Sequence, residues 1–165
     1  MSNVSLSAAA PAPLRSLAGV PADPSAGIAA AAHVLLSHLE RGSRIHAVAL
    51  RAAMEHAFGG SDAAGAWDWK TAYDACEAAT VLFMRKFGPA IRARAESPAA
   101  ELPMLGRIAA LLPTHTRRSE ESQALQQFST PIALGFVAAS AAAISPADLV
   151  LEPSAGTGLL AEQLP

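Results

Sequence analysis

A stripe of apolar side chains recurs in steps of three and four residues near the middle of the chain. Its members are Trp69, Ala72, Tyr73, Cys76, Ala79, Phe83 and Phe87. This is the period of an amphipathic α-helix, so residues from about Trp67 to Phe87 are predicted to form a helix with one buried face. Gly88 and Pro89 follow as strong helix breakers and are expected to end it. The aromatic side chains, including Trp67, are therefore expected to lie in a core.

Three shorter segments show the same period. Helices are expected from Ile28 to Arg41, from Arg44 to His56 with Ile45, Val48, Ala49 and Ala52 on the buried face, and from Pro98 to Leu112 with Ser97 as the cap. Alanine makes up 40 of the 165 residues and is the best helix former. Residues 27–112 are therefore predicted to form a compact helical domain. Residues 1–26 hold four prolines among Ala and Ser and are predicted to be a disordered arm.

Charge and cysteine content exclude several classes of protein. The formal net charge of −2 excludes a polycation that coats nucleic acid by charge alone. The single cysteine, Cys76, excludes an intrachain disulfide framework and a cysteine-based zinc cluster, and is expected to be buried. The five histidines lack paired ligand spacing, so no metal site is predicted. The longest apolar run, Ile132 to Ile144, is shorter than the ~20 residues of a spanning helix. With no signal peptide in view, a cytoplasmic protein is expected.

The character of the chain changes after Pro113. A helix is expected from Pro131 to about Ala143, with Thr130 as its cap, followed by a short strand at 149–151, a glycine turn at 156–158 and the start of another helix at Leu159. A glycine turn at a helix N-terminus presents backbone N–H groups to a ligand. No Gly-Lys-Ser/Thr follows, which excludes a Walker loop. The spacing also fits the dinucleotide fingerprint, but Glu152 at the strand end would repel a pyrophosphate and suits an amine-bearing ligand.

Two motifs in this region carry a family resemblance. The segment Leu149-Val-Leu-Glu-Pro-Ser-Ala-Gly-Thr-Gly158 resembles the S-adenosylmethionine motif of class I methyltransferases, especially the N6-adenine DNA methylase type, and Gln127-Phe-Ser-Thr-Pro131 resembles the Gln-Phe-x-Thr-Pro motif that precedes it. The resemblance implies that S-adenosylmethionine is the cofactor and that Glu152 orients its methionine amino group. The implied cofactor-binding residues are Phe128, Ser129, Thr130, Pro131, Glu152, Pro153, Ser154, Ala155, Gly156, Thr157 and Gly158.

A wider resemblance extends over residues 28–164. The segments that carry it are Phe58-Gly-Gly-Ser-Asp62, Trp67-Asp-Trp-Lys70, Arg85-Lys-Phe-Gly88 and Leu112-Pro-Thr-His-Thr-Arg-Arg-Ser-Glu120. They are similar to the N-terminal region of bacterial strawberry notch-like proteins, large methylase/helicase polypeptides. The resemblance implies a helical region and a methyltransferase-like domain ahead of a helicase-type NTPase, with DNA as the partner. Residues 113–165 would be the start of that methyltransferase-like domain.

Several parts of such a protein are missing from these 165 residues. The chain supplies one expected strand of about seven, no acidic end of a second strand, and no Asn/Asp-Pro-Pro-Tyr/Phe motif to hold the target amine. The expected fold is therefore mainly α, a helical region followed by the first helix–strand–Gly-loop–helix element of an incomplete Rossmann-like α/β domain. The chain is expected to be an N-terminal fragment or truncated product, without catalytic residues and inactive by itself.

A basic segment leaves the partner open. Residues 85–118 hold seven basic and two acidic side chains, a local charge of +5. Candidate DNA contacts are Arg85, Lys86, Arg92, Arg94, Arg117 and Arg118, although a solvated helix face explains such a run more simply. Two other hypotheses therefore stand beside the enzyme fragment: a non-enzymatic helical module that binds nucleic acid or protein, and a nonfunctional remnant. The oligomeric state stays open.

Overall fold

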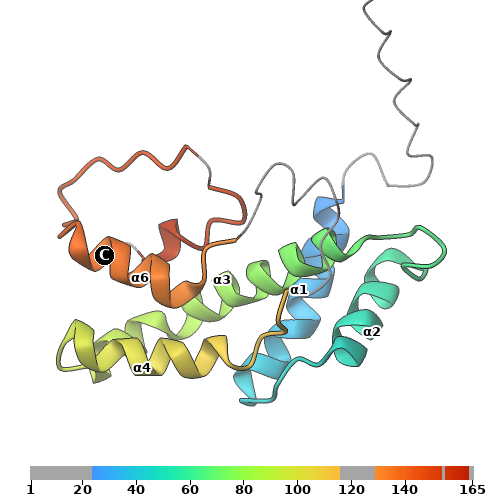
Figure 1. Cartoon of the computed structure of the whole chain (residues 1–165), viewed down its shortest axis with the longest axis horizontal. Helices are drawn as coiled ribbons and strands as arrows, with labels where there is room; N and C mark the ends of the chain where they lie inside the picture. The colour runs from blue at the N-terminus through green and yellow to red at the C-terminus, as the bar shows by residue number, and fades with distance from the viewer. Residues whose placement is uncertain (1–23, 116–128, 154, 164–165) are drawn as a thin grey trace, which may run out of the picture.

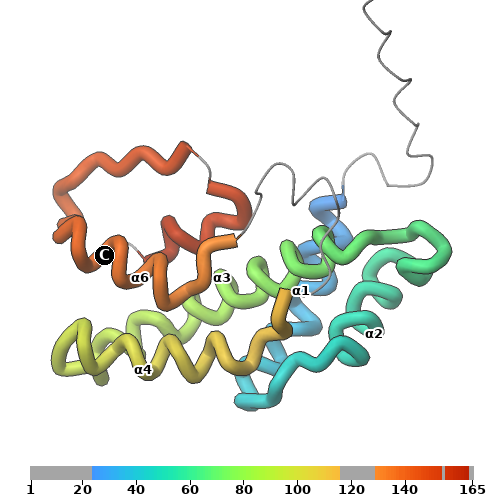
Figure 2. The backbone as a smooth tube through the Cα atoms, in the orientation of Figure 1, coloured from blue at the N-terminus to red at the C-terminus, as the bar shows by residue number. Residues whose placement is uncertain are grey.

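The computed structural model describes residues 24–115, 129–153 and 155–163. Within them lie five α-helices and one short 3₁₀ turn (Figure 1): α1 (Ser25–Glu40), α2 (Ala47–Phe58), α3 (Trp69–Arg94), α4 (Pro98–Ala109), α6 (Ile132–Ala141) and η1 (Ala161–Gln163). The described residues contain no strand, and the prediction of a mainly α protein is confirmed. Figure 2 shows α1 and α2 around the N-terminal half of α3, and α4 and α6 around its C-terminal half. Of the described helices, none has the length and apolar character needed to cross a bilayer.

The first core lies between α1, α2 and the N-terminal half of α3. Its larger buried side chains are Leu35, Leu39, Ile45, Leu50, Met54, Trp67, Tyr73 and Cys76. In α1 the buried residues Ala31, Ala32, Leu35 and Leu39 follow the expected helical spacing. The small side chains of Ala72, Ala75 and Ala79 let α1 approach α3 closely, and all three are buried. The alanine excess therefore serves close helix packing as well as helix formation.

A second core lies at the other end of α3. Its buried members are Val81, Met84, Leu105, Ile108, Ile132, Phe136 and Leu159, drawn from α3, α4, α6 and the segment before η1. The core thus joins residues on both sides of the predicted domain boundary at residue 113. A single 26-residue helix, α3, contributes side chains to both cores.

Polar side chains cap α3 and α4, the second of them through the expected residue Ser97. The Asp68 side chain accepts a hydrogen bond from the Thr71 N–H at 2.7 Å at the start of α3. At the start of α4, the Ser97 hydroxyl oxygen accepts from the Ala100 N–H at 3.2 Å. Gly59 ends α2 with a left-handed φ of 70°, a conformation that favours glycine. Residues 1–23 of the predicted arm lie outside the described residues, and residues 24–26 cap and begin α1.

Three of the helix predictions are wrong in detail. Helix α3 does not end at Gly88 and Pro89 but continues to Arg94. An interior proline costs about 3 kcal/mol, and the extra turn partly offsets this because it packs Ile91 against the second core. Helix α4 ends at Ala109 rather than at Leu112. Helix α6 begins one residue after Pro131, which is its N-cap and makes no side-chain cap bond, so Thr130 is not the cap.

The buried face predicted for α2 is also wrong. Val48 is 80% exposed, and Leu50, Ala53 and Met54 are buried instead. Ile45 is buried but lies before the helix, where its N–H donates to the Leu111 carbonyl at 2.7 Å. The larger side chains of Leu50 and Met54 decide which face turns to the core, because they remove more apolar area from water.

The strand expected at 149–151 is not formed. Leu151 is 87% exposed and Val150 is 40% exposed. A strand is stable only when a neighbouring strand accepts its ladder of hydrogen bonds. The described part of the chain offers no such neighbour, so these residues lie at the surface without pairing.

Candidate functional site

The glycine turn expected at residues 156–158 is formed. Gly156 and Gly158 have φ values of 53° and 84°, both in the left-handed region. A Cβ at Gly158 would meet nothing within 4 Å, so backbone conformation rather than crowding favours glycine there. The Gly158 N–H donates to the Ala155 carbonyl at 2.7 Å and closes the turn. The helix expected from Leu159 is only the 3₁₀ turn η1 in the described residues.

Three side chains attach this turn to α3 and the second core. The Thr157 hydroxyl donates to Oε2 of Glu77 at 2.8 Å. Glu162 forms an ion pair with Arg85 at 3.0 Å. Leu159, between these two contacts, is buried in the second core. The turn is therefore fixed on the surface of the helical part of the protein.

Glu77 is a functional candidate that the sequence did not indicate. Its Oε1 atom is buried and makes no hydrogen bond within the described residues. Burial raises the pKa of Glu77, the negative charge of Asp74 adds to the rise, and the Thr157 hydroxyl and Lys70 oppose it. In the sequence, Glu77 lies next to Cys76 of the apolar stripe. A single acidic residue at this position indicates only the border between the buried and the exposed face of the helix. Its partner Thr157 is 80 residues away, so no local pattern reveals the contact.

The predicted cofactor-binding residues are described in part. Phe128 and Ser154 lie outside the described residues. Directly before α6, the exposed residues are Ser129, Thr130 and Pro131. Near the glycine turn, Pro153 and Ala155 are exposed and Glu152 is half-buried. A Cβ at Gly135 in α6 would lie 3.2 Å from Leu160 Cδ1, which shows how closely α6 approaches the segment after the glycine turn. The elements that follow the two motifs therefore pack together.

The basic segment is partly neutralised. Arg85 pairs with Glu162, and Lys86 pairs with Glu40 at 2.6 Å. Arg92 and Arg94 are exposed near the C-terminus of α3, and Arg117 and Arg118 lie outside the described residues. Two of the candidate DNA contacts thus already have acidic partners within the chain, which lowers the local positive potential.

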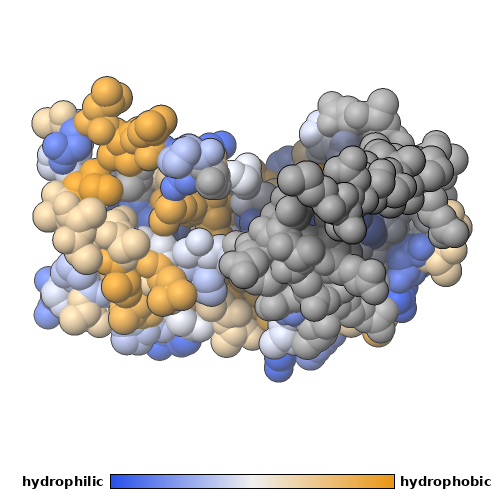
Figure 3. Space-filling view, turned by 45° about the horizontal axis from the view of Figure 1, so that its top comes forward, coloured by the Kyte–Doolittle hydropathy of each residue, from blue (hydrophilic) through white to orange (hydrophobic). Residues whose placement is uncertain are grey.

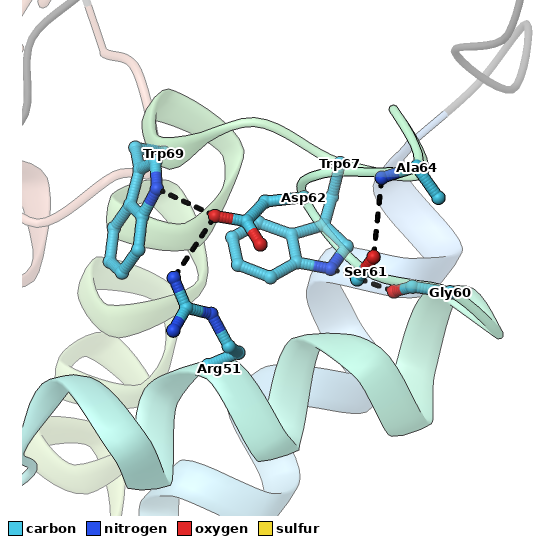
Figure 4. Close-up of polar contacts among 7 residues, drawn as sticks. All are labelled: Arg51, Gly60, Ser61, Asp62, Ala64, Trp67 and Trp69. Atoms are coloured by element: carbon cyan, nitrogen blue, oxygen red, sulfur yellow. Dashed lines mark hydrogen bonds and ion pairs between the residues drawn. The ribbon is translucent and has the colours of Figure 1, made fainter.

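A polar network lies at the opposite end of α3 (Figure 4). Asp62 Oδ2 accepts hydrogen bonds from Arg51 and from the indole N–H of Trp69, each at 3.1 Å. The Trp67 indole donates to the Gly60 carbonyl at 2.9 Å. Desolvation raises the pKa of Asp62, but the hydrogen bonds and charge of Arg51 outweigh it and lower the pKa below its ordinary value. The network joins the two segments at 58–62 and 67–70 to α2.

A small pocket lies beside this network. Its volume is about 150 Å³, and it is lined by Arg44, Ile45, His46, Ala47, Trp69, Tyr73, Pro113 and Thr114. Trp67 and Tyr73 are buried, as predicted, whereas Trp69 is only half-buried. Tyr73 also stacks on His115, with ring centroids 4.2 Å apart. Across the described ranges, no group of three or more His, Cys, Asp or Glu side chains is placed to hold a metal ion.

Apolar side chains gather over α6 and the C-terminal segment (Figure 3). Those most exposed are Leu134, Val137, Leu149 and Leu151. A contiguous exposed apolar surface of this kind usually marks an interaction site.

Comparison of the chain with protein families, with curated proteins and with solved structures finds no match. The family resemblance therefore rests on the sequence segments quoted above, and the contacts of the glycine turn and of the aromatic pocket are the structural observations that bear on function.

Proposed function

We propose that this chain is the N-terminal region of a strawberry notch-like DNA methyltransferase/helicase that carries S-adenosylmethionine-binding residues without the catalytic motif. The observation that carries the proposal is the glycine turn. Gly156 and Gly158 adopt left-handed conformations in a turn that begins four residues after Glu152. Thr157 and Leu159 attach the turn to the helical region, in the order of elements that the family resemblance implies.

The residues present fit the chemistry of that cofactor. Ser129, Thr130 and Pro131 would hold its methionine end together with Phe128, and Glu152 would orient the methionine amino group. The unpartnered Oε1 of Glu77 supplies a further acceptor beside the turn, which suits a ligand that carries amine or hydroxyl donors. When bound, S-adenosylmethionine supplies the methyl group for transfer to an adenine amine. In the intact protein, the residues of this chain would bind and orient the cofactor.

The exposed apolar segment supports the same proposal. Leu149 and Leu151 are largely exposed, and Leu134 and Val137 of α6 are 59% and 44% exposed. In a Rossmann-like sheet, residues 149–151 would pair with neighbouring strands and be covered on both faces. We infer that the rest of a methyltransferase-like domain provides those strands. Arg92 and Arg94, with Arg117 and Arg118, are the candidates for contact with DNA in the intact protein.

Calorimetric titration with S-adenosylmethionine tests this proposal. The 165-residue chain should show no measurable binding, whereas a polypeptide that continues the reading frame past Pro165 by one domain length, about 100–150 residues, should bind. Gly158→Ala should weaken that binding, because alanine disfavours a φ of 84°. The control is Gly106→Ala, since a Cβ at Gly106 in α4 meets nothing within 4 Å.

Two outcomes would count against the proposal. The enzyme assignment fails if the longer polypeptide does not bind the cofactor, or if its sequence contains no Pro-Pro-aromatic motif. Micromolar binding by the 165-residue chain alone would contradict the requirement for the further strands.

A further inference from the structure

The carboxyl group of Glu77 meets fewer hydrogen-bond donors at the glycine turn than an ionised carboxylate needs. Its Oε2 atom accepts the Thr157 hydroxyl at 2.8 Å, and its Oε1 atom is buried with no hydrogen-bond partner among the described residues. An ionised carboxylate offers about four acceptor sites on its two oxygens. A single hydrogen bond therefore leaves much of a partly buried negative charge without compensation, and this is costly.

A proton on Glu77 lowers this cost and keeps the contact with the turn. A hydroxyl can both donate and accept, so a proton on Oε2 of Glu77 can be donated to the Thr157 oxygen in place of the bond in the other direction. The buried Oε1 is then an uncharged carbonyl oxygen, which costs less to bury than an ionised one. While the turn lies on α3, the protonated form of Glu77 is therefore favoured.

The charges around Glu77 do not reverse this preference. Among the described residues, the charged groups that act on it are Asp74 and Lys70, which both belong to α3 and pair with each other at 3.0 Å. Burial is the largest influence and raises the pKa of Glu77. Asp74 adds to this rise, whereas Lys70 and the uncharged Thr157 hydroxyl of the turn oppose it. The direction of the pKa shift thus agrees with the geometry of the contact.

The other two attachments of the turn are of a different kind. Leu159 makes apolar contacts in the second core and has no proton to exchange. The ion pair between Arg85 and Glu162 is open to solvent, since the Arg85 side chain is 68% exposed, and such a pair contributes little. Of the three attachments, the one at Glu77 is the one that encloses an atom of an ionisable group.

We propose that Glu77 and Thr157 form a proton-dependent latch, which holds the glycine turn on α3 while Glu77 is protonated and weakens once Glu77 is ionised. When the turn opens, water reaches the carboxylate and stabilises its charge. Loss of the proton therefore favours the open turn. One consequence, a pH-dependent affinity for S-adenosylmethionine, rests on the proposed function. The release of the turn itself does not depend on what the turn binds.

Amide hydrogen exchange of the full 165-residue chain, without any cofactor, tests the latch over about pH 4 to 8. After correction for the intrinsic exchange rate, the opening equilibrium of residues 155–163 should rise with pH in the wild type. The rise should reach up to about tenfold per pH unit above pH 4.5, the ordinary pKa of a glutamate, and should level off above the pKa of Glu77 in the closed turn. Glu77→Gln keeps the shape of the side chain and an acceptor for Thr157 but cannot ionise, so its opening should not change with pH.

Two further variants separate the latch from a general loosening of the turn. Asp74→Asn removes a negative charge that raises the pKa of Glu77, so the rise should level off at a lower pH. Glu162→Gln is the matched control, because it removes the acidic side chain of a different attachment and should leave the rise in place. A wild type whose opening does not change with pH, or a Glu77→Gln protein that follows the wild-type curve, would overturn the inference. If Glu77→Gln does not fold, an Asp74→Asn curve that coincides with the wild-type curve overturns it.

Discussion

The hydroxyl of Thr157 donates a hydrogen bond to Oε2 of Glu77 across 2.8 Å, joining residues that are 80 positions apart in the chain. The contact fixes the glycine turn against α3. Within the described residues, the Glu77 side chain makes no other hydrogen bond. The other carboxylate oxygen, Oε1, is buried and has no hydrogen-bond partner among the residues that the structure describes. This pairing links the geometry of the turn to the protonation state of the Glu77 side chain.

Removal of the Thr157 hydroxyl should loosen the turn. Thr157→Val leaves both oxygens of the Glu77 carboxylate without a protein partner, which should cost about 1 kcal/mol. Amide hydrogen exchange across residues 155–163 should become faster, while exchange in α1 stays unchanged. Thr157→Ser, which keeps the hydroxyl, serves as the control. Equal exchange in the valine and serine variants would show that the bond does not hold the turn.

Glu77 should also make stability depend on pH. Its pKa in the folded protein is raised above the ordinary value of 4.5, chiefly by burial. The folded state therefore binds the proton more tightly than the unfolded state, and this contribution to the free energy of unfolding is complete below pH 4.5 and is lost as pH rises through the folded pKa. Urea denaturation over a pH series should show this loss in the wild type and not in Glu77→Gln. If the free energy of unfolding depends on pH in the same way in both proteins, Glu77 does not make this contribution. The pKa of Glu101 is raised as well, but it is common to both proteins and cancels in the difference.

The two faces of α2 can be distinguished by a pair of truncations. Leu50 is fully buried, so Leu50→Ala should lower the free energy of unfolding by about 2–5 kcal/mol through lost burial and a cavity. Val48 is 80% exposed on the same helix, and Val48→Ala should stay within about 0.5 kcal/mol. Chemical denaturation measures both. A larger effect at Val48 would restore the face first expected from the sequence.

Two helical glycines should respond to alanine with opposite signs. A Cβ at Gly27 in α1 would lie 2.5 Å from Cζ of Phe58, so Gly27→Ala should be destabilising by about 1 kcal/mol despite the better helix propensity of alanine. A Cβ at Gly106 in α4 meets nothing within 4 Å, and Gly106→Ala should stabilise by about 0.5–1 kcal/mol. Melting temperatures report both changes. A stabilised Gly27→Ala protein would mean that the Phe58 ring moves aside freely.

Cys76 should be chemically inert in the folded protein. Burial raises the pKa of its thiol to about 12, with the charge of Glu77 adding to the rise, so almost no thiolate is present at neutral pH. A thiol reagent such as DTNB should react with Cys76 only after denaturant is added. Rapid reaction under native conditions would indicate that α3 separates readily from α1.

Local sequence signals determine much of the helical architecture. Ser97 was predictable as a cap because a short polar side chain directly before a helical period can satisfy the first N–H groups of the helix. The stripe along α3 was predictable for the same reason, since its spacing is a property of neighbouring residues. Gly156 and Gly158 were predictable as turn residues because their conformation is decided by their own backbone.

The errors arise where distant residues compete with local preference. Pro89 lies inside α3 because Ile91 gains packing against the second core, which is built from segments far apart in the chain. The face of α2 depends on where α1 lies, and the period alone does not reveal this. The Glu77–Thr157 contact and the aromatic pocket each combine residues from separate segments. Neither leaves a pattern in any single stretch of sequence.

Because α3 supplies side chains to both cores, the two halves of the molecule should lose their structure together rather than one at a time. A shorter polypeptide that stops at residue 112 would keep α3 and α4 but lose Ile132, Phe136 and Leu159, the residues that cover Val81 and Met84. Such a truncated product would expose an apolar surface that is buried in the full chain, and it would tend to self-associate. The shared helix thus makes the C-terminal segment a cover for the helical region, whether or not its glycine turn binds a cofactor.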